Sequence, residues 1–308
     1  MNRNRTVKPG LPDGRRVLLV VNPAAGGADG FRRARLAAEV FRAAGAQVTV
    51  LEPAVPDGLP ELLDRAADDA DALVAVGGDG LVQCVAEAAL RRGLPLGIVP
   101  AGTGNDAARA LRLPKHPRAA ARRAVAGWAN GGRPADVARV TLSDGAVRHF
   151  LTALAAGFDA VVNERANSWR RPRGGLKYVL ALLACLPSVR PVRYRLRVHG
   201  VAEETTAVIL TVANGPSFGG GLRIAPAARL DDGALDLVTV DPIPRLALLT
   251  VFPLAFAGLH VLHPAVHIRR VRHVTIVSGG PRCYADGEPI GLAPLEVDVL
   301  PGALTVLA

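Results

Sequence analysis

The first part of the chain alternates apolar runs with helix-like stretches, and this alternation restricts the possible folds most strongly. The run Arg16–Val21 reads RVLLVV, and Ala72–Val76 reads ALVAV. Nearly continuous apolar runs of this kind are typical of parallel strands that are buried on both faces. Further strands are expected at Gln47–Leu51 and Pro95–Val99, with helices at Phe31–Ala44, Leu59–Asp68, Leu81–Arg91 and Asn105–Leu111. The pattern predicts a parallel α/β sheet with helices on both faces.

The pattern changes after Gly127–Pro134, a segment rich in glycine that we expect to link two domains. Helix-like stretches beyond it are confined to Leu176–Leu186 and the region of Leu246–Leu262. Short strand-like segments make up the rest: Val137–Leu142, His149–Ala153, Tyr194–Val198, Ala207–Ala213, Leu235–Val240, Val274–Val277 and Leu295–Val299. We therefore expect an α/β domain over residues 14–127 and a mostly antiparallel β domain over residues 134–308, whose extreme C-terminus can pack back on the first domain.

The composition and charge restrict the class of partner. Hydrophobic residues make up 50% of the chain and charged residues 21%, which is enough apolar surface for real cores. The formal net charge of +10 favours an anionic partner: a nucleotide, a nucleic acid or an anionic membrane. Aromatic residues make up 4% and are not interleaved with basic ones, which disfavours binding of single-stranded nucleic acid.

The cysteines and the apolar stretches bear on the cellular compartment. Cys84, Cys185 and Cys283 lie far apart and form no CxxC pair, which favours a reducing cytoplasm over a disulfide framework or a zinc site. The basic start has no apolar segment of the signal-peptide type behind it, so no signal peptide is expected. Polar residues and a proline interrupt Leu246–Leu262, and we expect a buried or interfacial helix there rather than a spanning one.

The segment Ala72–Gly80 (ALVAVGGDG) has a glycine-rich turn between a buried strand and a helix. Gly77, Gly78 and Gly80 let the backbone approach a ligand closely. Ligands bind at this end of parallel strands, where a helix N-terminus attracts anions. Asp79 would repel a bare phosphate, which indicates a bridging Mg²⁺ or a proton-accepting role. A tight turn in which Asp79 caps the helix explains the same residues equally well.

A second turn of this kind lies in Ile98–Asp106 (IVPAGTGND), again between a strand and a helix. Two glycine-rich turns at neighbouring strand ends favour a shared cleft. The glycines match the dinucleotide fingerprint, but no acidic residue ends the next strand, so we discount that interpretation. The turn Val21–Pro23, taken alone, is better explained as an ordinary Asn-Pro turn.

In order and spacing, these motifs resemble the diacylglycerol kinase catalytic-domain family of bacterial lipid kinases, which is related to the sphingosine kinases. The first half carries VNPAAGG, GGDGLVQCV and VPAGTGNDAARAL, and the second half carries matching segments at Gly157–Ala160, Asn214–Gly221, Pro226–Asp236 and Ala285–Pro289. The resemblance implies a first domain of the phosphofructokinase type and a β-sandwich-like domain for the lipid substrate. It also implies transfer of the γ-phosphate of ATP to a lipid hydroxyl with the help of Mg²⁺.

The resemblance further implies functional residues, position by position. ATP is expected to bind at Asn22, Gly26, Gly77, Gly78, Gly80, Thr103, Asn105 and Lys177. Mg²⁺ is expected at Asp79, Asp106 and Asp136, and a structural metal at Asp232 with the carbonyls of Arg229 and Ala234. The catalytic candidates are Asp79, Asp286 and Glu288, and which carboxylate is the base is left open. Without the resemblance, Asp231–Gly233 and Tyr284–Glu288 are better explained as ordinary turns.

The expected reaction is phosphorylation of diacylglycerol to phosphatidic acid at a membrane surface. The chain departs from the family pattern at Ala25, Gly27, Pro53, Leu81, Gln83 and Cys84. These departures leave two alternatives open: a kinase of another lipid, such as a sphingoid base or a polyprenol-type acceptor, and a catalytically weak module that binds membranes. NAD kinases share the GGDG turn, but the GTGND and DGEP segments disfavour that activity.

A basic run stands before the apolar segment Tyr178–Leu186 and contains Arg165, Arg170, Arg171, Arg173 and Lys177. This order suits an anionic lipid surface, and a solvated loop before a core helix explains it equally well. We expect peripheral association with an anionic membrane from the cytoplasm, and no nucleic acid partner. A homodimer is left open.

Overall fold

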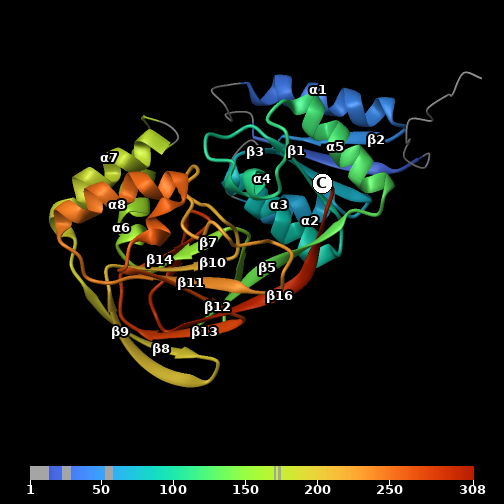
Figure 1. Ribbon diagram of the computed structural model, residues 1–308. Helices are drawn as coiled ribbons and strands as arrows, with labels where there is room; N and C mark the ends of the chain where they lie inside the picture. Colours follow the sequence, from blue (N-terminus) through green and yellow to red (C-terminus); the bar gives the residue numbers. More distant parts are fainter. Residues whose placement is uncertain (1–13, 23–28, 53–57, 170, 173–174) are drawn as a thin grey trace, which may run out of the picture. The chain divides into compact units, whose positions relative to one another are not determined.

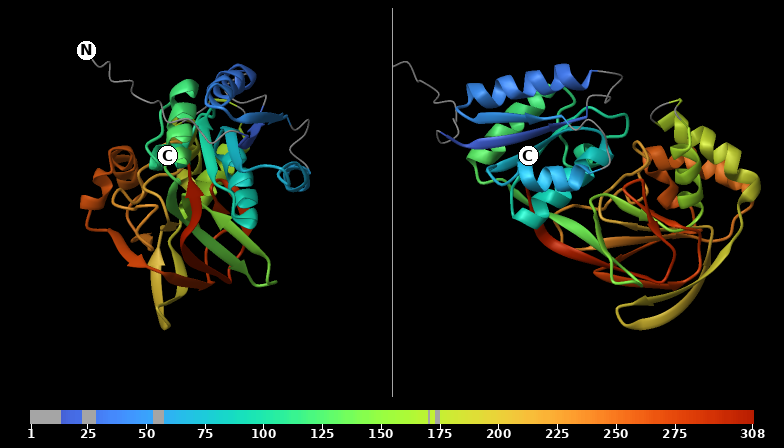
Figure 2. Two further views of the ribbon diagram at one scale, coloured as in Figure 1. Left: turned by 90° about the vertical axis from the view of Figure 1, so that its right-hand side faces the viewer. Right: turned by 180° about the vertical axis from the view of Figure 1, so that it is seen from behind.

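The structure is a computed structural model that describes residues 14–22, 29–52, 58–169, 171–172 and 175–308. The chain folds as two compact units (Figures 1 and 2). The first contains Met1–Gly102, Leu113–Pro134 and Leu304–Ala308, and the second contains Thr103–Arg112 and Ala135–Ala303. Thr103–Arg112 thus groups with the second unit although residues of the first unit flank it on both sides.

A parallel sheet with strand order β2-β1-β3-β4 forms the centre of the first unit. Its strands are β1 (Arg16–Val21), β2 (Gln47–Leu51), β3 (Ala72–Gly77) and β4 (Leu96–Pro100). Every residue of β3 and β4 is buried, as their unbroken apolar sequences predict. At the edge of the sheet, Val306 near the end of the chain pairs in parallel with Leu96 of β4.

Helices cover both faces of this sheet: α1 and α5 pack together on one face, and α2 and α3 on the other (Figure 1). Their bounds are α1 (Gly30–Ala43), α2 (Leu59–Ala66), α3 (Asp79–Arg92) and α5 (Pro117–Ala129). On the face covered by α1 and α5, Val17 and Leu19 of the sheet form one buried cluster with Phe41 and Ala121. This core fixes the ends of the strands from which the glycine-rich turns begin.

The second unit is built around an antiparallel sheet with strand order β12-β11-β10-β7-β14-β15. Its strands are β7 (Ala153–Ala155), β10 (Ile209–Ala213), β11 (Leu235–Val240), β12 (Val266–Val271), β14 (Cys283–Ala285) and β15 (Glu288–Gly291). A second group of strands lies against it: β5 (Arg133–Leu142), β6 (Val147–Phe150), β8 (Val192–Val198), β9 (Val201–Ala207), β13 (His273–Ser278) and most of β16 (Leu295–Val306).

The central sheet of the second unit is buried on both faces. In β11, Leu235 and Leu237 belong to the core shared with the other strands, whereas Val238 and Val240 belong to the core shared with helices. The helices are α4 (Asp106–Ala110), α6 (Phe158–Asn167), α7 (Gly175–Cys185) and α8 (Arg245–Ala257), with short 3₁₀ turns η1 (Leu186–Ser188) and η2 (Leu259–Leu262). The unit therefore has three layers, with α6, α7 and α8 forming the outermost one (Figure 2). Among the helices that the structure describes, none has the length and apolar character needed to span a membrane.

The predicted fold class is confirmed: an α/β unit with a parallel sheet and a mostly antiparallel, sandwich-like unit. The sequence does not predict α6, because its residues FDAVVNERAN include few strong helix formers. Packing on α7, β10 and β14 stabilises this helix instead. In addition, α5 continues to Ala129, so Gly127 is helical rather than part of a linker. A Cβ at Gly127 would lie 2.8 Å from the backbone nitrogen of Ala308, which explains the glycine at this position.

Candidate active site

Three turns lie together at the carboxyl edge of the parallel sheet in the first unit. The backbone N–H of Asn22, after β1, donates to the carbonyl of Val76 in β3 at 3.3 Å. The N–H of Ala101, after β4, donates to the carbonyl of Gly77 at 2.8 Å. These bonds hold the turns side by side at the edge where parallel sheets bind ligands.

Two glycines bring the turns after β3 and β4 into backbone contact. A Cβ at Gly78 would lie 3.2 Å from the Cα of Gly102, so a side chain at Gly78 would push the two turns apart. A Cβ at Gly77 would lie 2.6 Å from Cδ2 of Leu81, which already fills the space beside it. Leu81, a departure from the family pattern, is therefore part of the packing under the turn.

Asp79 is the first residue of α3 and lies half-exposed next to this contact. Gly78 precedes it with extended backbone, and Gly80 after it is exposed. The first N–H groups of a helix have no partner within the helix and carry a partial positive charge. The arrangement offers N–H groups to an anion and a carboxylate to a metal ion or a proton in one small region.

Asp106 begins α4 in the second unit and is buried. Its carboxylate accepts hydrogen bonds from the Arg109 guanidinium at 2.6 Å and the Gly220 N–H at 2.7 Å. The Ser217 hydroxyl donates to it at 3.2 Å. Asp106 therefore ties the start of α4 to the glycine-rich segment 214–221 within the second unit. Asn105 before it has a left-handed φ of 54°. Thr103 is exposed.

Asp136 in β5 is buried and holds another turn of the second unit. Its carboxylate accepts the N–H of Gly233 at 2.7 Å and the N–H of Gly302 at 2.8 Å. Each of its two oxygens accepts one N–H and keeps a second lone pair. The metal role predicted from the sequence for Asp106 and Asp136 stays a prediction, and the structure shows that both carboxylates hold turns of the second unit.

The turn that Asp136 holds contains the predicted structural metal site. Asp232 accepts the N–H of Ala234 at 3.2 Å and forms an ion pair of 2.6 Å with Arg270. Arg229 is exposed and binds the carboxylate of Asp231 at 2.9 Å. Among the residues that the structure describes, no group of three or more His, Cys, Asp or Glu side chains is arranged to hold a metal ion. A cation at Asp232 would compete with Arg270 for the same carboxylate.

Asp286, a candidate base, uses its carboxylate to bind the chain between β6 and β7. The carboxylate accepts the N–H groups of Leu151 at 2.6 Å, Thr152 at 2.8 Å and Ala153 at 3.2 Å, and the Thr152 hydroxyl also donates to it. Burial raises the pKa of Asp286, and these hydrogen bonds oppose the rise. Glu288, two residues later, is exposed. The geometry therefore favours a structural role for Asp286.

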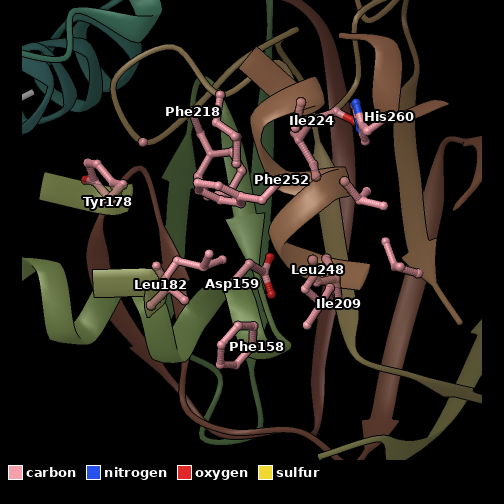
Figure 3. A pocket seen from close by; sticks show the side chains of 16 residues that line it. Phe158, Asp159, Tyr178, Leu182, Ile209, Phe218, Ile224, Leu248, Phe252 and His260 are labelled. Atoms are coloured by element: carbon pink, nitrogen blue, oxygen red, sulfur yellow. The ribbon is translucent and has the colours of Figure 1, made fainter. Parts of the chain in front are cut away.

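An apolar pocket lies in the second unit between the central sheet and the outer helices (Figure 3). The empty space within it, counted together with open solvent at its mouth, is about 730 Å³. Its lining comes from α6, α7, α8, the central sheet and the segment 218–224: Phe158, Asp159, Val162, Tyr178, Leu182, Ile209, Phe218, Gly219, Leu222, Ile224, Val240, Leu248, Val251, Phe252, Ala255 and His260. The sequence analysis did not find this pocket, because its residues are spread over elements distant in the chain.

Three side chains bring polar atoms to the apolar lining: Asp159, Tyr178 and His260. The carboxyl of Asp159 accepts the Thr211 hydroxyl at 2.6 Å and the Gly157 N–H at 2.8 Å. Burial raises the pKa of Asp159 to about 6, against the opposing effect of these bonds. Nε2 of His260 donates to the carbonyl of Ile224 at 3.1 Å, and burial lowers the pKa of this histidine. The resemblance drew attention to Gly157–Ala160 as a motif but assigned Asp159 no role.

Comparison with known proteins gives the family. Residues 16–140 match the diacylglycerol kinase catalytic domain, and residues 152–308 match the YegS C-terminal NAD kinase beta sandwich-like domain. A diacylglycerol kinase of Mycobacterium tuberculosis is 40% identical over 243 residues, which cover 78% of each chain. The chain belongs to the diacylglycerol kinase family of lipid kinases. The family resemblance predicted from the motifs is confirmed.

Other relatives agree with this family. A protein of Pseudomonas aeruginosa named "Probable lipid kinase YegS-like" is 34% identical over 237 residues, covering 76% of this chain and 75% of that one. The crystal structure of a diacylglycerol kinase from Bacillus anthracis aligns with a TM-score of 0.70 over 96% of this chain and 98% of that one, at 20% identity. At this identity the structural likeness speaks for the fold, which it supports over nearly the whole chain.

The remaining predicted positions of the diacylglycerol kinase site are distributed as follows. Lys177, in the first turn of α7, is half-buried, and desolvation lowers its pKa. Its helix begins beside the segment 214–221, since a Cβ at Gly175 would lie 3.8 Å from the carbonyl oxygen of Gly220. Gly26 lies outside the described residues, as do Ala25, Gly27 and Pro53 among the departures. The structure thus brings together Asn22, Gly77, Gly78 and Asp79 in the first unit.

Proposed function

We propose that this chain is an ATP-dependent kinase that phosphorylates a lipid hydroxyl, with diacylglycerol as acceptor and phosphatidic acid as product. The observation that carries the proposal is the apolar pocket of the second unit, in a chain of the diacylglycerol kinase family. A water-soluble acceptor would need many polar partners, whereas this lining offers polar atoms at three side chains, Asp159, Tyr178 and His260, among apolar ones. Each methylene group of an acyl chain that enters such a pocket gains about 0.8 kcal/mol.

The nucleotide is assigned to the carboxyl edge of the parallel sheet. There Gly78 and Gly102 keep the backbone close, and the N-terminus of α3 offers N–H groups to phosphate oxygens. Asn22 is held at the same edge by its bond to Val76. This supports the binding positions predicted at Asn22, Gly77, Gly78 and Gly80. The predicted contacts of Gly26, Thr103, Asn105 and Lys177 with the nucleotide remain proposals.

Asp79 is our candidate for the catalytic base. In the proposed step the lipid hydroxyl oxygen forms a bond to the γ-phosphorus, the bond from that phosphorus to the bridging oxygen breaks, and ADP leaves with the electron pair. The hydroxyl proton passes to a carboxylate. Asp79 begins α3 at the edge assigned to the nucleotide, which supports it as the base. Asp286 lies in the second unit and accepts hydrogen bonds from three backbone N–H groups. Glu288 remains a second exposed candidate.

Mg²⁺ fits this chemistry at Asp79, whose carboxylate stands beside N–H groups suited to phosphate. When bound, the ion neutralises phosphate charge and stabilises the charge that develops during transfer. Asp106 and Asp136 already accept hydrogen bonds from this chain's own donors. We propose that Asp79, which begins α3 beside these N–H groups, is the carboxylate that faces the metal, and that Asp106 and Asp136 hold turns of the second unit.

One observation favours a second acceptor, a sphingoid base. Asp159 lines the pocket with a pKa raised to about 6, so most of this carboxyl is ionised at pH 7. A buried carboxylate in an apolar pocket is complementary to the amino group of a sphingoid base and has no partner in a plain acyl chain. The acceptor class therefore depends on whether Asp159 contacts the lipid.

A lipid panel tests the proposal. Purified protein is incubated with ATP labelled at the γ-phosphate, Mg²⁺ and detergent micelles of diacylglycerol, a sphingoid base or a polyprenol, and the lipids are extracted. We expect label in phosphatidic acid and none with Asp79→Asn. Label in the sphingoid base alone would replace diacylglycerol by the second candidate. No label in any lipid, with ATP bound in a separate assay, would leave a membrane-binding module without kinase activity.

A further inference from the structure

The outermost helices of the second unit expose leucines on the sides that do not line the pocket. In α7, Leu176, Leu180 and Leu183 follow each other at helical spacing and are 58%, 39% and 46% exposed. Residues three, four and seven positions apart share one face of a helix. The other face of α7 contributes Tyr178 and Leu182 to the pocket.

Helix α8 and the short turn η2 that follows it likewise have an exposed side with leucines and a side that lines the pocket. Leu246 at the start of α8 is 74% exposed, and Leu262 in η2 is 78% exposed. Leu254 and Leu259 between them are also exposed. The opposite side of α8 faces the pocket with residues such as Leu248, Val251, Phe252 and Ala255. We call the exposed residues Leu176, Leu180, Leu183, Leu246, Leu254, Leu259 and Leu262 the leucine face.

The two helices are neighbours in the second unit. Both contribute side chains to the pocket described above (Figure 3). A Cβ at Gly175, where α7 begins, would lie 3.4 Å from the ring of Phe256 near the end of α8. Scattered exposed leucines are normal on protein surfaces, but a concentration on adjacent helices marks a candidate interaction site.

The charges around the leucine face fit an anionic lipid surface. The sequence contains no acidic residue between Glu164 and Glu203, a stretch that includes all of α7, and none between Asp241 and Asp286, which includes α8 and η2. Exposed arginines stand in or next to these helices at Arg171, Arg223 and Arg245. Leucines combined with basic and no acidic residues are the pattern of helices that lie in a membrane interface.

We propose that the leucine face docks on an anionic bilayer and inserts its leucines among the lipids, so that an acceptor passes from the leaflet into the pocket behind the same helices. The proposal rests on the function proposed above for its second half, the passage of the acceptor. The docking itself is independent of catalysis. The docking proposal specifies which surface contacts the membrane. The basic run before α7 does not specify it, since Arg170 and Arg173 lie outside the described residues.

Sedimentation with vesicles, without ATP, tests the docking. One variant combines Leu176→Ser, Leu180→Ser and Leu183→Ser, and a second combines Leu259→Ser and Leu262→Ser. The matched control combines Val201→Ser and Leu292→Ser, which are 67% and 63% exposed and lie outside these helices. None of these residues lines the pocket. We expect each leucine variant to lower the partition into vesicles of phosphatidylcholine with phosphatidylglycerol at least about tenfold, since leucine burial is lost.

Three results of this experiment would overturn the proposal. They are unchanged partition of both leucine variants, an equal loss in the control, and a loss of self-association in the leucine variants without loss of vesicle binding, which would make the face a contact between two copies. Turnover of micellar lipid by the leucine variants should equal that of the wild type. If the wild type phosphorylates no lipid at all, the proposed function fails while the vesicle result still decides the docking.

Because the variants with two or three serines can fail to fold for reasons unrelated to docking, a single substitution provides a second test. Leu183→Trp adds a fluorophore to the leucine face, and Val201→Trp adds one elsewhere in the same unit. Vesicles of lipids with brominated acyl chains should quench the added fluorescence of Leu183→Trp and not that of Val201→Trp. Equal quenching in the two variants, or none in either, would overturn the insertion.

Discussion

Two aspartates that follow strands in this protein lie in different surroundings. Asp79 follows β3, begins a helix and is half-exposed beside glycine-rich turns. Asp286 follows β14 with a φ of 48°, and its carboxylate accepts hydrogen bonds from Leu151, Thr152 and Ala153. Both stand next to glycine in a short motif, GGDG and ADGEP. The comparison teaches that an Asp-Gly pair after a strand does not by itself define a role, because the two pairs lie in different surroundings: one begins a helix at the edge of a parallel sheet, and the other lies in a hairpin turn.

The second unit extends the contrast. Asp106 and Asp136 accept hydrogen bonds from residues more than 90 positions away, such as Gly220 and Gly302, and hold loops in place. A carboxylate used in this way contributes to catalysis through the positions of other groups. We therefore propose that Asp79 in the first unit takes part in the chemistry, and that Asp106 and Asp136 hold loops of the second unit.

The largest expected effect belongs to Asp79→Asn. The side chain keeps its size and loses its charge, so proton acceptance and metal binding both fail. We expect a loss of kcat of about 10²–10⁴-fold with an unchanged melting temperature. Turnover above about a tenth of the wild-type rate, measured as labelled phosphatidic acid, would remove Asp79 from the chemistry.

Asp286→Ala should act on stability first. It leaves three backbone N–H groups and one hydroxyl without their acceptor, and a buried donor that loses its partner costs about 1–3 kcal/mol. We expect the free energy of unfolding in urea to fall by about 2–4 kcal/mol in total, since water can reach some of these groups. Glu288→Ala, which removes an exposed carboxylate two residues further along the chain, is the matched control, with a change in the free energy of unfolding below about 1 kcal/mol. Full stability with a collapsed kcat in Asp286→Ala would reverse the two assignments and make Asp286 the base.

Asp159 predicts a pH effect on stability. Its pKa is raised to about 6 in the folded protein from an ordinary value of 3.8, so the folded state binds the proton more tightly than the unfolded chain. This contribution is fully present below the unfolded pKa and is lost as pH rises through the folded one. From this difference in pKa, the free energy of unfolding of the wild type should fall by up to about 3 kcal/mol between pH 4 and pH 7, relative to that of Asp159→Asn. Urea unfolding of both proteins at the two pH values measures the difference, and parallel curves would contradict it.

The smallest effect is expected at the Asp232–Arg270 ion pair. The arginine side chain is 61% exposed, and exposed pairs of this kind contribute about 1 kcal/mol or less. Arg270→Ala should therefore leave both stability and turnover near the wild-type values. Asp136→Ala, which removes the buried acceptor of the same turn, should lower the free energy of unfolding by about 2 kcal/mol. The contrary outcome is a large and equal loss of unfolding free energy in Arg270→Ala and Asp232→Ala. If added Mg²⁺ or Ca²⁺ did not change that loss, the pair would be a structural ion pair rather than a metal site.

The sequence predicted the local features and not the long-range ones. The strands β1, β3 and β4 could be predicted because their apolar runs are continuous, and the glycine-rich turns follow each run directly. The partners of Asp136 at Gly233 and Gly302 could not, since no local pattern links these positions. The pocket could not be predicted for the same reason. Helix α6 could not be predicted because tertiary packing, rather than helix propensity, stabilises it.

We propose that the first unit binds the nucleotide and carries the chemistry, whereas the second unit binds the acceptor lipid. A comparison of kcat with KM tests this most directly. Rates of labelled phosphatidic acid formation are measured against diacylglycerol concentration in micelles for the wild type, Asp79→Asn and Val251→Phe, whose larger side chain would fill part of the pocket. We predict that Asp79→Asn lowers kcat with little change in the KM for the lipid. We predict that Val251→Phe raises this KM with little change in kcat. A Val251→Phe protein that is folded and keeps the wild-type KM for every acyl length would contradict the assignment of the acceptor to this pocket.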